Sequence, residues 1–237
     1  MSLILRKDGL EIKMEVDYSW ENRIEFDWLI SSMGGVGSTA LMKYLENVAK
    51  INPTGFHTGC SRFKHARWPD PFWNVKGAIF VYGDPRDATI SLFNRVLVHT
   101  HLTNMAVPKR KLIVPDEVQA GPGFDGIPAN IQRYMDLNED VFQFEEMIKN
   151  WATQLTPYPR MLVKHEKLYD NPEAVLDFLK CNVGIFRESF PKKKTRSSNW
   201  SEHPCAGQLS NLFSGLIEKI DTIPDVLVIP SNEKMDW

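Results

Sequence analysis

The fold that this sequence predicts depends most on the stretch Ile30-Ser31-Ser32-Met33-Gly34-Gly35-Val36-Gly37-Ser38-Thr39-Ala40-Leu41. The largely apolar residues 26–30 before its serines indicate a buried strand, and residues 40–45 carry helical periodicity. The three glycines between them let the backbone curl closely around an anion. The N-terminus of the following helix adds unpaired N–H groups and about half a positive charge. The stretch therefore predicts a strand, an anion-binding loop and a helix.

The loop differs from the Walker A pattern of nucleotide-hydrolysing enzymes. That pattern, G-x-x-x-x-G-K-[ST], places a lysine after its last glycine, whereas Ser38 directly follows Gly37 here. Hydrolysis of a nucleoside triphosphate by a loop lysine and magnesium is therefore disfavoured. An alternative is that the glycines form only a tight turn, with Ser38 and Thr39 as capping residues of the helix.

Composition limits the classes of protein to consider. The chain has 237 residues, of which 43% are hydrophobic and 24% are charged, which suits one domain with a central sheet and helices on both faces. The formal net charge of −2 gives no case for a nucleic-acid or anionic-membrane partner, so any anion site must be local. No run approaches the roughly 20 apolar residues that span a bilayer. We expect a cytoplasmic protein.

Cysteine usage indicates neither a disulfide framework nor a metal cluster. Cys60, Cys181 and Cys205 are odd in number and form no C-x-x-C pair. We expect three reduced thiols and no metal.

Strands and helices alternate along the rest of the chain. Beyond the first strand and helix (residues 24–32 and about 38–50), the pattern predicts strands at residues 77–82 and 161–166 and helices at 86–98, 139–155, about 172–179 and 208–220, with an N-terminal hairpin or arm at 1–23 and a polar tail at the end. This alternation is typical of an α/β protein with a parallel sheet. Residues 99–137, rich in proline and glycine, predict a lid or a wall of the substrate pocket within a single domain spanning residues 1–237.

Three distinctive turns follow the predicted strands. In a parallel sheet, ligands bind beyond the carboxyl ends of the strands, where residues 33–39, 83–86 and 166–167 would lie together. A late basic segment, Pro191-Lys192-Lys193-Lys194-Thr195-Arg196-Ser197-Ser198-Asn199-Trp200, ends in an aromatic residue. A run of charges is also typical of an ordinary solvated surface.

Together these segments resemble the sulfotransferase family, which transfers a sulfonate group from 3′-phosphoadenosine 5′-phosphosulfate to a hydroxyl or amine. The family's first loop resembles P-K-S-G-T-T, and Gly37-Ser38-Thr39 fits its last three positions. Its second element resembles R-N-P-R-D-x-x-x-S, which residues 84–91 fit closely from Asp84 to Ser91. Its third resembles L-x-V-R-Y-E-D-L-x-x-D-P, which residues 162–173 follow, and the basic segment stands where the fourth belongs. The resemblance covers residues 26–200 and implies a three-layer sandwich with a central parallel sheet, similar to P-loop NTPases.

The resemblance also implies a set of donor-binding residues. The 5′-phosphosulfate would lie on the backbone of the loop, and the 3′-phosphate would meet Ser91 and the cations of the later segments, while Trp200 would flank the adenine or simply pack in the core. The implied residues are Gly34, Gly35, Val36, Gly37, Ser38, Thr39, Arg86, Ser91, Lys192, Lys194, Arg196 and Trp200.

Two cations of the family pattern are missing. The loop Lys or Arg falls at Gly35, and the arginine two residues before the proline falls at Gly83. The candidates to supply this charge are Arg86, Arg95, Lys192, Lys194 and Arg196. Arg86 has an equal alternative, which is to pair with Asp84 or Asp87.

The chemistry of the family calls for a general base and for groups that stabilise the leaving phosphate. Ser38, together with helix N–H groups, is a candidate for the second task. His65 is our first choice for the base, because Lys64-His65 stands where the family has K-x-H. His57 is second, and His99 and His101 could line the acceptor pocket. The aromatic residues 63–73 predict either an acceptor wall or a flap over the core.

The sequence thus predicts a sulfotransferase whose acceptor is a small molecule or a glycan and whose co-substrate is 3′-phosphoadenosine 5′-phosphosulfate. Two alternatives remain open. One is a non-catalytic binding protein of similar fold that has lost the cations at Gly35 and Gly83, and the other is a P-loop kinase. The oligomeric state is left open as well.

Overall fold

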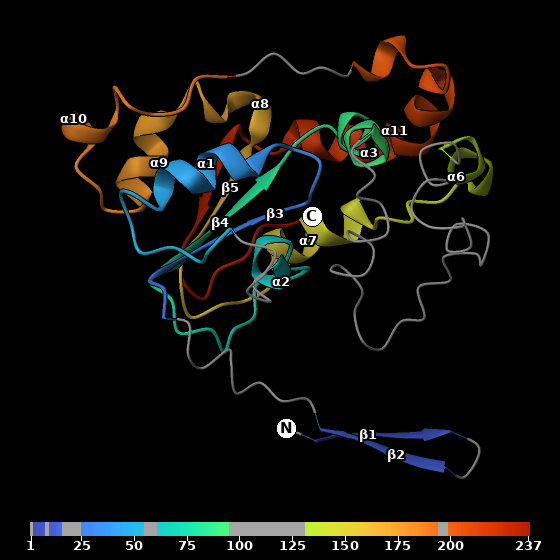
Figure 1. Cartoon of the computed structure of the whole chain (residues 1–237), viewed down its shortest axis with the longest axis horizontal. Coiled ribbons are helices and arrows are strands. Elements are labelled where there is room, and N and C mark those ends of the chain that lie inside the picture. Colours follow the sequence, from blue (N-terminus) through green and yellow to red (C-terminus); the bar gives the residue numbers. More distant parts are fainter. Residues whose placement is uncertain (1, 8–9, 16–24, 55–60, 95–130, 194–198) are drawn as a thin grey trace.

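The computed structural model describes residues 2–7, 10–15, 25–54, 61–94, 131–193 and 199–237 of the chain. The N-terminal hairpin is confirmed: β1 (Ser2–Lys7) pairs antiparallel with β2 (Leu10–Glu15) in a two-stranded sheet. A second sheet has four strands in the order β3-β4-β5-β6 (Figure 1). This second sheet carries the predicted motifs.

The four-stranded sheet is mixed rather than wholly parallel. β3 (Trp28–Ser32), β4 (Gly77–Tyr82) and β5 (Arg160–Lys164) run parallel, as expected. β6 (Val226–Ile229) runs antiparallel to β5, so the prediction of a parallel sheet is wrong for this strand. These residues lie in the predicted polar tail as a short apolar run. Pairing with β5 gives it strand geometry.

Helices connect and flank these strands. They are α1 (Ser38–Leu45), α2 (Ser61–Lys64), α3 (Pro85–Asn94), α6 (Ile131–Leu137), α7 (Phe144–Thr153), α8 (His165–Leu168), α9 (Pro172–Phe178), α10 (Val183–Phe186) and α11 (Ala206–Thr222), with a 3₁₀ turn at Trp200–Glu202.

Helices cover both faces of the four-stranded sheet. Phe80 of β4 stacks on Trp151 of α7 with ring centroids 4.8 Å apart. Trp28 of β3 points to the opposite face. It is paired with Gly77, which lies three residues before Phe80, and side chains alternate between the two faces along a strand. The ring of Trp28 lies 5.6 Å from that of Phe178 in α9. Figure 1 shows α1, α8 and α9 on one side of the strands and α2 and α7 on the other. The α/β class is therefore confirmed.

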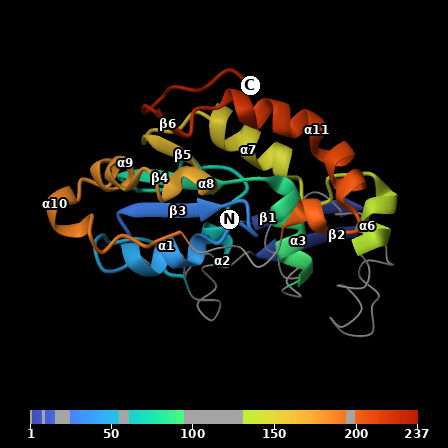
Figure 2. The same cartoon turned by 90° about the horizontal axis from the view of Figure 1, so that it is seen from above.

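The last helix extends the layer formed by α7. Phe213 of α11 packs against Phe144 of α7 with centroids 6.2 Å apart, and Lys219 pairs with Glu145 at 2.5 Å. Figure 2 shows the two helices side by side. α11 is thus fixed next to the sheet before the chain turns back into β6.

Several predicted boundaries differ from the structure. α1 ends at Leu45 rather than near residue 50, and α7 begins at Phe144 rather than at residue 139. The strand predicted at residues 161–166 ends at Lys164, because α8 begins at His165. The segment predicted as an irregular lid at 99–137 contains helix α6 in its last seven residues. Residues 99–130, the rest of that prediction, lie outside the described part of the chain.

A buried carboxyl group precedes α7. Asp140 Oδ2 accepts a hydrogen bond from the backbone N–H of Glu145 at 3.1 Å, while Oδ1 is buried without a hydrogen-bond partner among the described residues. Burial raises the pKa of Asp140 to about 6. The folded chain therefore holds a proton on this group that the unfolded chain, with an ordinary Asp pKa near 4, releases at lower pH.

This shift predicts that Asp140 makes stability fall as the pH rises. Between about pH 4 and pH 6 the folded state binds more protons than the unfolded state, so the free energy of unfolding decreases by about 2 kcal/mol. Asp140→Asn keeps an oxygen acceptor for Glu145 and removes the titration. Its stability relative to the wild type should rise across this interval in urea unfolding. Parallel curves for Asp140→Asn and the wild type would contradict the prediction.

Candidate functional site

The glycine loop joins β3 to α1 as the sequence predicts. Gly34, Gly35 and Gly37 have φ angles of +86°, +65° and +77°, the left-handed region that favours glycine. Gly37 is the N-cap residue of α1, so Ser38 and Thr39 lie inside the helix and are not its capping residues. The first turn of α1 holds no acidic residue, and its N-cap supplies no side-chain acceptor. This helix end is therefore suited to an external anion.

Gly35 and Gly83, the two positions at which the sulfotransferase pattern has cations, are restricted by packing to different degrees. A Cβ atom on Gly35 would lie 2.5 Å from the backbone oxygen of Ala88 in α3. A Cβ atom on Gly83 would lie 2.9 Å from a carboxylate oxygen of Glu166. Gly35 cannot hold a lysine or arginine without movement of the α3 backbone, whereas at Gly83 only the flexible Glu166 side chain would have to move. Any cation at the loop must come from another element.

Lys64 brings a cation to the loop from α2. Its Nζ donates a hydrogen bond of 2.7 Å to Oγ1 of Thr39, in the first turn of α1. Lys64 is only 7% exposed, so its stem is packed while its ammonium group lies at the helix N-terminus. The sequence reading quoted Lys64 with His65 but did not include it among the sources of the missing charge. The K-x-H position was the signal that could have identified it.

Ser31, a buried serine of β3, fixes the backbone around Lys64. Its hydroxyl accepts a hydrogen bond from the N–H of Ala66 at 3.0 Å and donates one to the carbonyl of Lys64 at 3.2 Å. A buried hydroxyl that makes both bonds avoids the cost of an unsatisfied polar group. The segment that carries Lys64 and His65 is therefore held at the end of β3.

His65 lies behind the loop with its ring orientation fixed. It is 7% exposed, and its Nδ1 lies 3.0 Å from the backbone oxygen of Ser32. A carbonyl oxygen only accepts, so we assign the proton to Nδ1, which leaves Nε2 as the basic nitrogen. The hydroxyl of Ser32 also lies 2.9 Å from that of buried Ser38. The structure thus brings together His65 and Ser38, the two predicted catalytic residues.

Arg86, in the turn at residues 83–86, lies in contact with Trp200, at the end of the basic segment. Nε and Nη2 of Arg86 donate to the Asp84 carboxylate over 2.7–3.1 Å, so the alternative of an Asp84 pair is observed. The same guanidinium lies 3.9 Å from the centre of the Trp200 ring, a cation–π contact. The N–H of Trp200 donates to Asp87 at 3.2 Å. Ser91, one turn further along α3, is buried.

A second imidazole stands on the other side of the loop. Nε2 of His165, at the start of α8, would lie 3.3 Å from a Cβ atom on Gly37. Lys193 donates to the backbone oxygen of Glu166 at 3.2 Å, which places the start of the basic segment beside the end of β5. The sequence reading missed His165. Its position near the end of the strand predicted at residues 161–166 was the available signal.

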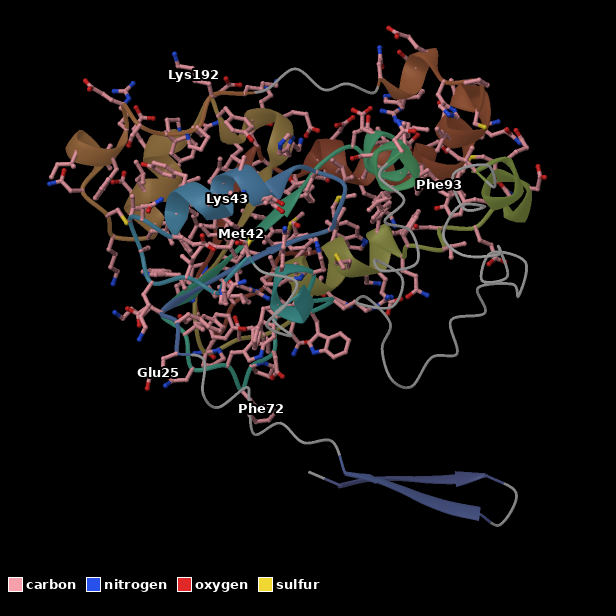
Figure 3. The ribbon with its side chains drawn as sticks, viewed as in Figure 1. Glu25, Met42, Lys43, Phe72, Phe93 and Lys192 are labelled. Carbon is pink, nitrogen blue, oxygen red and sulfur yellow. The ribbon has the colours of Figure 1, made fainter. Side chains whose placement is uncertain are left out.

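The remaining predicted residues are placed as follows. Val36 is buried beside Gly83, since its Cγ1 would lie 3.3 Å from a Cβ atom there. Lys192 is exposed and lies at the outer edge of the molecule (Figure 3). The other candidates lie outside the described residues: His57, Arg95, His99, His101, Lys194 and Arg196.

Comparisons with protein-family models, with curated proteins and with solved structures find no match to this chain. In the described part of the chain, no helix is long and apolar enough to cross a membrane. The same residues contain no group of three His, Cys, Asp or Glu side chains placed to hold a metal ion. What the site presents is a glycine loop at a helix N-terminus with Lys64, His65 and His165 around it, an arrangement suited to a phosphate or sulfonate group.

The contact between Gly35 and α3 gives a direct test of this geometry. Gly35→Ala should lower the free energy of unfolding by about 2–4 kcal/mol, because it combines a positive φ with a clash against backbone. Gly215→Ala is the control, since a Cβ atom there meets nothing within 4 Å and α11 should gain about 0.5–1 kcal/mol. Denaturant unfolding measures both. A change below 0.5 kcal/mol for Gly35→Ala is incompatible with the packing described.

Proposed function

We propose that this protein is a sulfotransferase with a fold similar to P-loop NTPases, which transfers a sulfonate group from 3′-phosphoadenosine 5′-phosphosulfate to a hydroxyl or amine acceptor. The observation that carries the proposal is the 2.7 Å hydrogen bond from Lys64 Nζ to Thr39 Oγ1. The glycine loop has no lysine of its own, and this bond places the ammonium group of Lys64 at the helix N-terminus, where an anion would bind. The order of the four sequence elements supports the same assignment.

The loop and Lys64 suit the leaving phosphate. Donors that are already in place stabilise charge that develops in a transition state without further reorganisation. The first-turn N–H groups of α1, the ammonium group of Lys64 and the Ser38 hydroxyl can balance the charge on the departing oxygen. Their positions are fixed before any ligand binds, since Ser31 holds the Lys64 backbone.

His65 is suited to the proton transfer. The donor supplies the sulfonate group and a phosphate leaving group. As the acceptor oxygen or nitrogen forms its bond to sulfur and the bond between sulfur and the phosphate oxygen breaks, Nε2 of His65 takes the acceptor's proton. The hydrogen bond from Nδ1 to the Ser32 carbonyl fixes the tautomer in which Nε2 of the neutral ring can accept a proton, and it stabilises the imidazolium that forms. In-line displacement then leaves a bisphosphate nucleotide in the loop.

The nucleotide end of the donor would be bound by the turn at residues 83–86. Asp84 engages Nε and Nη2 of Arg86, and among the described residues Nη1 has no hydrogen-bond partner. That edge of the guanidinium suits the 3′-phosphate, with Ser91 on the same helix. One face of Trp200 is covered by Arg86. Its other face is a candidate platform for the adenine.

The first test is calorimetric titration with adenosine 3′,5′-bisphosphate. The wild type should bind, and Lys64→Met should bind about 10–100-fold more weakly because a charge-assisted contact is lost. Lys43→Met, an exposed lysine on the same helix as Thr39, is the control and should bind like the wild type (Figure 3). Absence of binding at millimolar nucleotide by the folded wild type would overturn the proposal. Equal weakening in both variants would overturn the role of Lys64.

The second test separates chemistry from binding at His65. His65→Gln should lower the conversion of the donor to bisphosphate, measured with mixed hydroxyl and amine acceptors, by about 10²–10⁴-fold. The bisphosphate affinity should change less than twofold, and His203→Gln should leave both quantities unchanged. Equal turnover by His65→Gln and the wild type would sink the assignment of the base. Magnesium-dependent ATP turnover that is lost in Ser38→Ala would favour the kinase alternative.

A further inference from the structure

A cavity of about 620 Å³ lies at the amino end of β3, away from the glycine loop. Its wall includes Glu25 and Asp27, which precede the strand, whereas the loop follows the strand at Ser32. The cavity is also lined by Phe63 of α2 and, from the segment that follows α2, by Asp70, Phe72 and Trp73. Figure 3 shows Glu25 and Phe72 on one side of the body that surrounds the four-stranded sheet, and Lys192 on the opposite side. The cavity is therefore separate from the site described above.

Aromatic side chains form one side of this cavity. Phe63 meets Phe26 and Trp73 edge to face, with ring centroids 5.2 and 5.9 Å away. Phe72 is 92% exposed at the cavity wall. Of the residues 63–73, for which an acceptor wall or a core flap was predicted, Phe63 is buried, while Phe72 and Trp73 face a cavity that is remote from the loop.

The charges around the cavity are unequal. Three of its lining residues are acidic and one, Lys50, is basic. Glu25 pairs with Lys50 at 3.2 Å, and Asp27 pairs with Lys76 at 2.7 Å. Asp70 accepts a hydrogen bond from the N–H of Phe72 at 2.9 Å and has no cationic partner in the described part of the chain. Among the described residues, Asp70 thus has no counter-charge, and it lies beside the exposed ring of Phe72 and the half-buried ring of Trp73.

We propose that this cavity is a second binding site, which takes an organic cation: an alkylammonium or guanidinium group on an apolar stem. Carboxylates bind such groups through charge-assisted hydrogen bonds, and the faces of Trp and Phe attract them through cation–π contacts. The volume suits a small ligand or one basic side chain of a peptide. An anion is disfavoured by the excess of carboxylates, and a neutral apolar ligand leaves Asp70 unpaired.

Two probes of similar shape test the charge requirement. Butylguanidinium should bind, with a saturable shift of the Trp73 indole resonance assigned through Trp73→Phe, whereas neutral N-butylurea should bind at least tenfold more weakly. A short arginine-containing peptide tests whether the cation belongs to a small molecule or to a peptide side chain. A small-molecule site should bind only butylguanidinium, whereas a peptide site should bind the peptide more tightly. Either outcome supports the site.

Matched variants test the residues. Asp70→Asn keeps the acceptor for Phe72 and should weaken butylguanidinium binding at least tenfold. Phe72→Ser, at an exposed position, should weaken it at least threefold. Asp177→Asn, an exposed carboxyl on α9, should have no effect. The proposal is overturned if the folded wild type shows no shift at tens of millimolar probe, if the urea binds equally well, or if Asp177→Asn weakens binding as much as Asp70→Asn. Adenosine bisphosphate affinity should be unchanged throughout, so this test is independent of the proposed function.

Discussion

The close approach of α3 to the glycine loop is the constraint on which the site depends. A side chain on Gly35 would meet the backbone oxygen of Ala88 at 2.5 Å, and backbone cannot move aside as a flexible side chain can. The loop therefore gains a tight fit to α3 and has no room for a lysine of its own. Lys64, arriving from α2, restores the cation without disturbing that contact.

Two buried serines at the end of β3 connect the sheet to this arrangement. Ser31 binds the backbone on both sides of His65, while Ser32 contacts Ser38 through its hydroxyl and His65 through its carbonyl. Serine is an uncommon choice inside a buried strand, because a hydroxyl costs free energy unless it is hydrogen-bonded. Here each hydroxyl is bonded, and each bond holds a residue of the site. A rigid strand thus sets the positions of groups that lie on α1 and α2.

The sequence predicted those elements whose information is local. Strand β4 has the bounds that its apolar run and terminal glycine indicate, and the strand, loop and helix around Gly34 follow from hydrophobic periodicity. β6 was missed because its four residues are defined by pairing with β5 rather than by their own pattern. Lys64 and His165 were missed for a related reason. Their roles come from contacts with Thr39 and Gly37, which are distant in sequence, and the local signals, a K-x-H position and the end of a predicted strand, do not say which residue is contacted.

The two ends of β3 carry opposite charge, which the net charge of −2 conceals. At the carboxyl end, a helix N-terminus and Lys64 favour an anion. At the amino end, Asp70 and its acidic neighbours favour a cation. Five residues of strand span about 13 Å, which exceeds the Debye length of about 8 Å at physiological ionic strength. Oppositely charged ligands at the two ends do not repel each other, so both sites can be occupied at once, and each must be judged from its own side chains.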